Sequence, residues 1–143
     1  MTFSFGQSEE ELIEIDVLHY ERRASGEYGD DNWLTTEIRV HAGCFHGKIS
    51  AAIITSEFTR FLPQLRELHE KLTGKAEFRT LEGQLSLTLM GDGRGHIELE
   101  GEVLDKAGIG NRLNFHLQLD QTHLAKSIRD LEGIIVKFPV RSI

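Results

Sequence analysis

Cysteine and long apolar runs are scarce in this sequence, and both absences narrow what the protein can be. Cys44 is the only cysteine among 143 residues, so no internal disulfide can form, which fits a reducing compartment. No apolar run approaches the roughly 20 residues that are needed to cross a bilayer. Residues 1–11 also lack the basic start and the apolar stretch of a signal peptide. These features predict a cytoplasmic protein with no membrane partner.

Positive charge is also in short supply. Lysine and arginine number 16 against 23 aspartates and glutamates, which gives a formal net charge of −7. Nucleic acids are bound largely by neutralising their phosphates with Lys and Arg, so this balance argues against a nucleic-acid partner. A net negative charge suits a basic partner, whose association it accelerates, and it also serves plain solubility.

The sequence does contain a strong alternation of apolar and polar residues. A period of two is typical of strands with one buried and one wet face, as in an antiparallel sheet. In the third alternating segment, for example, we expect Phe45, Ile49, Ala51 and Ile53 to face the core. The alternating segments are 13–17, 34–40, 45–53, 85–89, 97–103 and 113–119, with a shorter strand expected around 76–81.

Two stretches switch to a helical period. The first runs from Phe58 to Leu72 and is expected to close at Gly74, a residue suited to the position after a helix C-terminus. Pro63 lies inside this stretch and lacks a backbone N–H, so it must either kink the helix or begin a second one. The other helix is expected to follow Asp120 as its N-cap and to end before Pro139.

These elements predict one α+β domain over residues 1–143, because no Pro- or Ser-rich linker divides the chain. We expect a curved antiparallel sheet of about seven strands, with the two helices packed on one face. Each half of the chain ends with a strand that is followed directly by a helix, a pattern that hints at internal duplication. No repeat is found at the level of individual residues.

Glycine-rich segments in this chain are expected to be turns. Residues 91–95 (GDGRG) follow a strand, but a second strand comes next in place of the helix whose N-terminus would hold an anion. The spacing also departs from the common phosphate-binding fingerprints. Because glycines supply the positive φ of tight turns, we expect hairpins here and at residues 108–111.

His41, Cys44 and His46 form the only group that resembles metal ligands. Their spacing matches no common zinc pattern and a fourth ligand is not evident, so we expect no metal. His46 lies two residues from Cys44, on the same face of a strand, where it could activate the thiol. Nothing marks an orienting third group or an oxyanion hole, and no serine lies in a nucleophile elbow. We therefore expect neither catalytic residues nor a cofactor.

Three glutamates form an acidic stripe along one predicted strand. Glu98, Glu100 and Glu102 alternate in sequence, so they share a face, and Arg112 lies on the partner strand of the hairpin. The stripe is either a solvated sheet surface with cross-strand pairs or a recognition surface. We take these three residues as candidates for contact with a partner.

A second acidic group lies near the only tryptophan. Asp30 and Asp31 fall in a loop, and Trp33 begins the strand that follows it. Loop residues often carry function, and tryptophan supplies a large contact area at interfaces. Asp30, Asp31 and Trp33 are therefore also expected to contact a partner, with Trp33 placed either in the core or at its rim.

Five short sequence segments resemble those of a known family, and the resemblance covers most of the chain, from about residue 32 to residue 141. They are DNWL at 31–34, FRTLEGQLSL at 78–87, GDGRGHIELEG at 91–101, LQLDQT at 117–122 and FPVR at 138–141. In combination they resemble the WapI-type immunity proteins of bacteria. The segments are turns and strands and contain no catalytic signature.

The resemblance implies a cytoplasmic protein that neutralises a contact-delivered bacterial toxin, often a nuclease, by binding it. The partner would be a toxin domain, and an acidic protein would suit a basic nuclease by blocking the groove that receives phosphates. A competing interpretation is a small-ligand-binding or enzymatic domain. Its pocket would lie between sheet and helices, near His41, Cys44 and His46.

Overall fold

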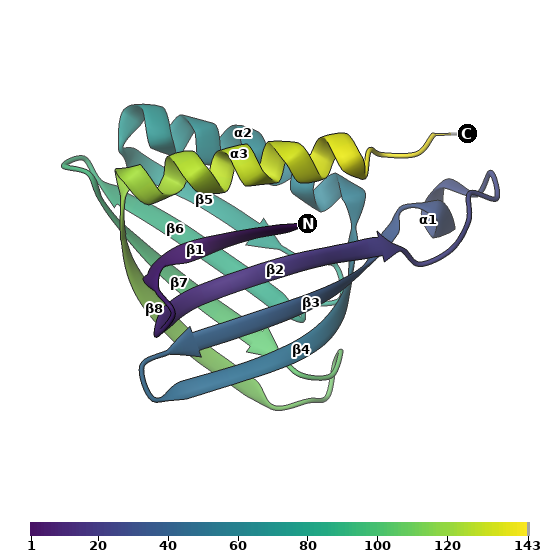
Figure 1. Ribbon diagram of the computed structural model, residues 1–143, viewed down its shortest axis with the longest axis horizontal. Coiled ribbons are helices and arrows are strands. Elements are labelled where there is room, and N and C mark those ends of the chain that lie inside the picture. Colours follow the sequence, from purple (N-terminus) through teal and green to yellow (C-terminus); the bar gives the residue numbers. More distant parts are fainter. Residues whose placement is uncertain (143) are drawn as a thin grey trace.

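Two separate four-stranded antiparallel sheets form the framework of the computed structural model, which describes residues 1–142. The strands of each sheet follow one another in space in the order in which they occur in the chain (Figure 1). The first sheet contains β1 (Thr2–Ser8), β2 (Glu11–Tyr20), β3 (Trp33–Ala42) and β4 (Phe45–Ile54). The second contains β5 (Thr73–Arg79), β6 (Leu85–Asp92), β7 (His96–Leu104) and β8 (Arg112–Asp120).

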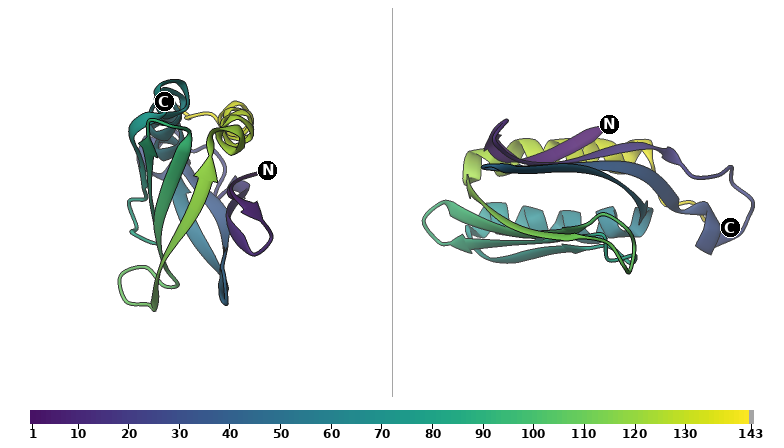
Figure 2. Two further views of the ribbon diagram at one scale, coloured as in Figure 1. Left: turned by 90° about the vertical axis from the view of Figure 1, so that its left-hand side faces the viewer. Right: turned by 90° about the horizontal axis from the view of Figure 1, so that it is seen from below.

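A long helix follows each sheet directly. Helix α2 (Thr55–Lys71) continues from β4, and α3 (Gln121–Lys137) continues from β8. A short helix, α1 (Tyr28–Asp31), lies in the connection between β2 and β3. The sheets form two facing layers, and α2 and α3 run side by side along one edge of these layers (Figure 2).

Each long helix covers the first strand of the other half of the chain. Helix α2 packs against β5, and α3 packs against β1. Each helix also contributes one hydrogen bond to the backbone of that strand. Gln64 Oε1 of α2 accepts from the Glu77 N–H of β5 at 3.0 Å, and the Ser127 hydroxyl of α3 donates to the Ser4 carbonyl of β1. The helices thus protect these two edge strands from pairing with another chain.

The predicted α+β class is confirmed, but the single curved sheet of about seven strands is wrong in detail. The described residues contain eight strands in two sheets, and the helices lie along an edge of the layers. Strands β4 and β5, which α2 connects, belong to different sheets and do not pair. The unpredicted strand is β1, in which Phe3 and Phe5 are fully buried.

One hydrophobic core joins both sheets and both long helices. Phe3 and Phe5 of β1, Phe58 and Phe61 of α2 and Phe78 of β5 pack with ring centroids 5.1 to 6.5 Å apart. Edge-to-face contacts of this kind add to the gain from burying the rings. Through these phenylalanines, helix α2 packs against β1 of the first sheet and β5 of the second.

Phe45 is the clear exception among the residues that were predicted to face the core. Ala51 and Ile53 of the same strand are buried and Ile49 is half-buried, but Phe45 is 66% exposed. It directly follows the turn at Gly43, at the open end of an edge strand where the second sheet does not cover it. The alternation sets the face on which a side chain lies, but not whether another layer covers that face.

The helix ends follow local signals, with one difference from the prediction. Pro63 lies inside a single helix, so it does not begin a second one. The turn out of α2 is made by Leu72, which adopts a left-handed conformation with φ of 59°, while Gly74 belongs to β5. Asp120 is the N-cap of α3 as predicted, and its carboxylate accepts from the Thr122 N–H at 2.9 Å.

Both glycine-rich segments form hairpin turns, as predicted. Residues 91–95 connect β6 to β7, and Gly93 and Gly95 have φ of 85° and 97°. The Asp92 carboxylate accepts hydrogen bonds from the N–H groups of Arg94 and His96 at 2.7 and 3.2 Å. These bonds hold the turn and lower the pKa of Asp92.

Candidate functional site

Asp31 directs its carboxylate into its own loop. The carboxylate accepts from the Ser25 N–H at 2.9 Å and from the Ser25 hydroxyl and the Gly26 N–H at 2.8 Å. The residue is only 4% exposed. Burial raises the pKa of Asp31, but the hydrogen bonds from Ser25 and Gly26 outweigh that effect and, with the charge of Arg141, hold the pKa below its usual value. In this structure the carboxylate serves to fix the loop.

Asp30 and Trp33 are more accessible than Asp31. Asp30 is exposed, and its Oδ2 lies 3.8 Å from Nη1 of Arg22 in a solvent-exposed ion pair. Trp33 is half-buried at the start of β3, where its Cα partner is Ile54 of β4. Its alternation with the buried Leu34 places Trp33 on the outer face of the sheet, so it does not lie in the core.

Asn32, between these residues, anchors the loop to two distant segments. Its Nδ2 donates to the Arg141 carbonyl at 2.9 Å, and its Oδ1 accepts from the Arg141 N–H at 2.7 Å. The Thr55 hydroxyl, at the start of α2, also donates to Oδ1 at 3.0 Å. The end of the loop that carries Asp30 is therefore held next to the C-terminal tail and α2.

The glutamate stripe lies on the outer face of the second sheet. Glu98 Oε1 accepts from Gln118 Nε2 at 2.9 Å, and Glu102 Oε1 lies 3.5 Å from Nε of Arg112. The three glutamates share an exposed face of β7, and Glu102 pairs with Arg112 of β8, as the alternating sequence predicts. The stripe belongs to β7 in one sheet, and Asp30 and Trp33 belong to the β2–β3 region of the other (Figure 1). The structure does not bring the two acidic groups together.

His41, Cys44 and His46 lie at the β3–β4 hairpin. The two histidines are cross-strand partners with ring centroids 5.5 Å apart, and Cys44 is exposed in the turn. The expected position near a pocket between sheet and helices is wrong, because α2 and α3 lie along β5 and β1. Within residues 1–142, no three His, Cys, Asp or Glu side chains are grouped so that they could hold a metal ion.

A narrow apolar cleft opens between the sheets, on the side away from the helices. It has a volume of about 170 Å³, and its walls are mainly the inner faces of β3, β4, β7 and β8. Ile38, Ile49 and Leu113 line it, with His46 and Arg112 also in its wall. Gln84 joins the two sheets here, because its Nε2 donates to the carbonyls of Ser50 and Leu104 at 3.1 Å. No sequence pattern indicates this cleft, because alternation does not show where two sheets diverge.

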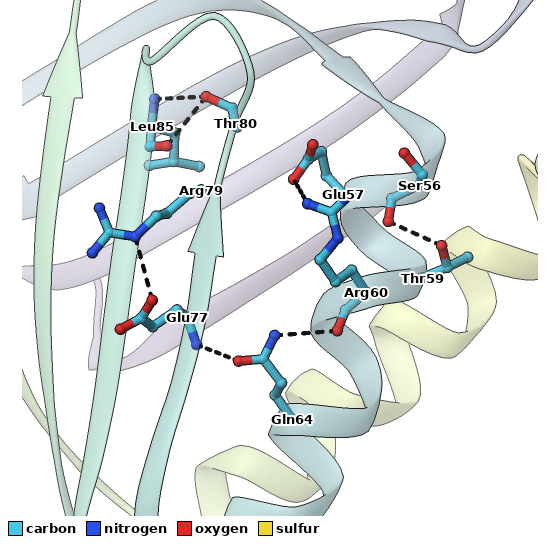
Figure 3. Close-up of polar contacts among 9 residues, drawn as sticks. All are labelled: Ser56, Glu57, Thr59, Arg60, Gln64, Glu77, Arg79, Thr80 and Leu85. Carbon is cyan, nitrogen blue, oxygen red and sulfur yellow. Dashed lines mark hydrogen bonds and ion pairs between the residues drawn. The ribbon is translucent and has the colours of Figure 1, made fainter.

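A polar cluster joins α2 to β5 on the other side of the molecule (Figure 3). Glu57 is buried and accepts from Arg60 Nη1 at 3.3 Å, while Gln64 Nε2 donates to the Arg60 carbonyl. Glu77 pairs with Lys75 and Arg79, which lower its pKa, Lys75 the more strongly. These ion pairs lie within α2 or within β5, and the hydrogen bond from the Glu77 N–H to Gln64 Oε1 joins the helix to the edge strand.

Comparison with protein families identifies one match. The model of the WapI-like immunity protein family matches residues 4–139, nearly the whole chain. A search of curated proteins found no match. No helix in the described part of the chain is both long and apolar enough to cross a membrane.

Proposed function

Since this chain belongs to the WapI-like immunity protein family, we propose that it neutralises a cognate bacterial toxin by binding it directly, without chemistry of its own. The observation that carries the proposal is the extent of the family match, which includes both sheets and both long helices. The match therefore concerns the whole fold and not a single motif. A protein of this kind acts by occupying a surface that the toxin needs.

The arrangement of the buried polar groups supports a binding role. Asp31, Asn32, Thr55 and Gln84 are buried, and each is hydrogen-bonded within the fold. Groups committed in this way stabilise loops and join the sheets. The surface is left to mediate recognition, where binding depends on shape, apolar contact and charge.

The toxin that we propose is a basic domain, with a nuclease as the leading candidate. The net charge of −7 supports this choice, because a nuclease must present positive charge to the phosphates of its substrate. An acidic inhibitor is attracted to the same charge and can cover it. The proposed place of action is the cytoplasm of the cell that makes the protein.

The test begins with the gene directly upstream of the gene for this chain, which we expect to encode a large secreted toxin. Its C-terminal domain should stop the growth of a bacterium that expresses it, and coexpression of this chain should restore growth. The purified pair should elute as a complex in size-exclusion chromatography. A toxin domain that kills in the presence of this chain and forms no complex with it would exclude the proposed pairing.

A further inference from the structure

Nearly all of the net charge belongs to the first sheet and its loops. Residues 1–54 contain 10 acidic and 4 basic residues, a net charge of −6. Residues 55–143 contain 13 acidic and 12 basic residues, a net charge of −1. The glutamate stripe of β7 lies in the second, nearly neutral part. A basic partner is therefore attracted mainly to the first sheet.

Two carboxylates face each other on the outer surface of this sheet. Asp16 of β2 and Glu37 of β3 are direct Cα partners, and both point away from the core. Like charges directly opposite one another destabilise a sheet. Each has one cation nearby, since Asp16 lies 3.4 Å from the N-terminal amine of Met1 and Glu37 lies 3.1 Å from Lys48 Nζ. These ion pairs are exposed and therefore weak, which leaves both carboxylates open to a stronger partner.

An aromatic residue lies on the same face as the two carboxylates. Trp33 and Glu37 are both at alternate positions of β3, with Thr35 between them, so all three point outward. Across the strand pair, Ile54 and Ala52 of β4 are the Cα partners of Trp33 and Thr35. Each of these five residues is partly exposed. The face thus combines an apolar area around a tryptophan with adjacent carboxylates.

We propose that this outer face of the first sheet, centred on Asp16, Glu37 and Trp33, is the surface that binds the basic toxin domain. The inference rests on the proposed function and adds the place of contact. The carboxylates attract Lys and Arg side chains of the toxin and speed association, while the tryptophan supplies the buried contact. Asp30, an exposed residue of α1, lies three residues before Trp33 and adds a further carboxylate to this part of the chain.

A matched pair of double variants tests the location. Asp16→Asn with Glu37→Gln alters the proposed face, and Glu98→Gln with Glu100→Gln alters the stripe on the second sheet by the same two charges. We expect the first variant to bind the upstream-encoded toxin domain about tenfold more slowly at low salt, and the second to bind like the wild type. The toxin is used as a catalytically inactive variant, so that it can be purified. Trp33→Ala should raise Kd at least about tenfold.

The outcomes separate this inference from the proposed function. If wild-type protein binds the toxin and the Asp16/Glu37 variant binds equally fast, the location is wrong and the immunity function stands. A defect confined to the Glu98/Glu100 variant would move the contact to the second sheet. If the wild type binds no toxin, both proposals fail. A Tm measurement for each variant shows whether it is still folded. Removing the facing carboxylates should leave Tm unchanged or raise it.

Discussion

Asp31 lies at the start of one of the segments that carry the family resemblance, and its carboxylate holds the loop from Ser25 to Asp31. Because its pKa is lower in the folded chain than in the unfolded one, the carboxylate stabilises the fold above about pH 4. That contribution is lost as the pH falls through the lower, folded-state value. Because the carboxylate is hydrogen-bonded within the loop, we expect it to influence a partner through the conformation that it gives the loop.

The pH dependence of Asp31→Asn tests this role. The variant should be less stable than wild type at pH 7, because an amide replaces the charged acceptor of Ser25 and Gly26. Its Tm should also fall less than that of wild type between pH 7 and pH 3. Asp30→Asn, one residue away and exposed, is the control and should follow the wild-type profile. Parallel profiles for wild type and Asp31→Asn would contradict this assignment.

Core and surface positions alternate along β6, which allows a direct test of the buried face. Leu87 is fully buried, whereas Met90 on the same strand is 51% exposed. Leu87→Ala should lower the free energy of unfolding by about 2 to 5 kcal/mol through lost contacts and the cavity left behind. Met90→Ala should change it by no more than about 0.5 kcal/mol. Urea unfolding measures both, and equal effects would mean that the strand is oriented differently.

Helix α2 contains the least favourable residue for a helix at an internal position. Pro63 has no N–H to donate to the Thr59 carbonyl, four residues earlier. The residue is exposed, so little packing depends on its ring. Pro63→Ala should therefore raise the free energy of unfolding, by up to about 3 kcal/mol. Glu70→Ala, at another exposed position of α2, is the control, and no gain for Pro63→Ala over it would show that the ring is needed.

The elements themselves were largely predictable, because the periods of two and 3.6 are local properties. The alternation at Ile13 and Ile15 or at Leu85 and Leu87 correctly placed buried faces on strands. The division into two sheets was not predictable, because a buried face looks the same whether its neighbour is in the same sheet or in another. Strand β1 carried a readable signal in Phe3 and Phe5, but this was too short to stand out.

The acidic candidates show the same limit at the surface. The sequence identifies carboxylates, but hydrogen-bond partners and strand register decide what each of them does. The Asp31 carboxylate accepts hydrogen bonds from its own loop, and the Glu102 carboxylate forms an ion pair with Arg112 across the hairpin. The facing pair of Asp16 and Glu37 exists only because of the register between β2 and β3, which 20 residues of intervening sequence do not reveal.

The whole molecule consists of two similar halves, each with four strands and a long helix, joined by exchange of their helices. The sequence hinted at this duplication only through the order of elements. Since α2 packs against β5 and α3 packs against β1, each half alone lacks the helix that lies along its first strand. In the first half, Phe58 and Phe61 of α2 still contact Phe3 and Phe5. We therefore expect the two halves to unfold as one cooperative unit.

Separate production of the halves tests this dependence. Residues 1–72 and residues 73–143 should each lack a cooperative thermal transition when they are made alone, because β1 loses α3 in the first fragment and Phe78 loses Phe61 of α2 in the second. An equimolar mixture should recover the near-ultraviolet circular dichroism of the intact chain. A sharp transition in either half alone would show that the exchanged helix is dispensable.

Because β1 packs against the last helix, a newly made chain can complete its fold only after α3 has been synthesised. A ribosome adds roughly 5 to 20 residues per second, so α3 is made about 6 to 25 seconds after β1. Until then β1 lacks the helix that packs against it, and the Ser4 carbonyl lacks its hydrogen bond from the Ser127 hydroxyl. Under the proposed function, the chains that were completed before the toxin entered the cell protect it, since chains that are still being translated give no protection.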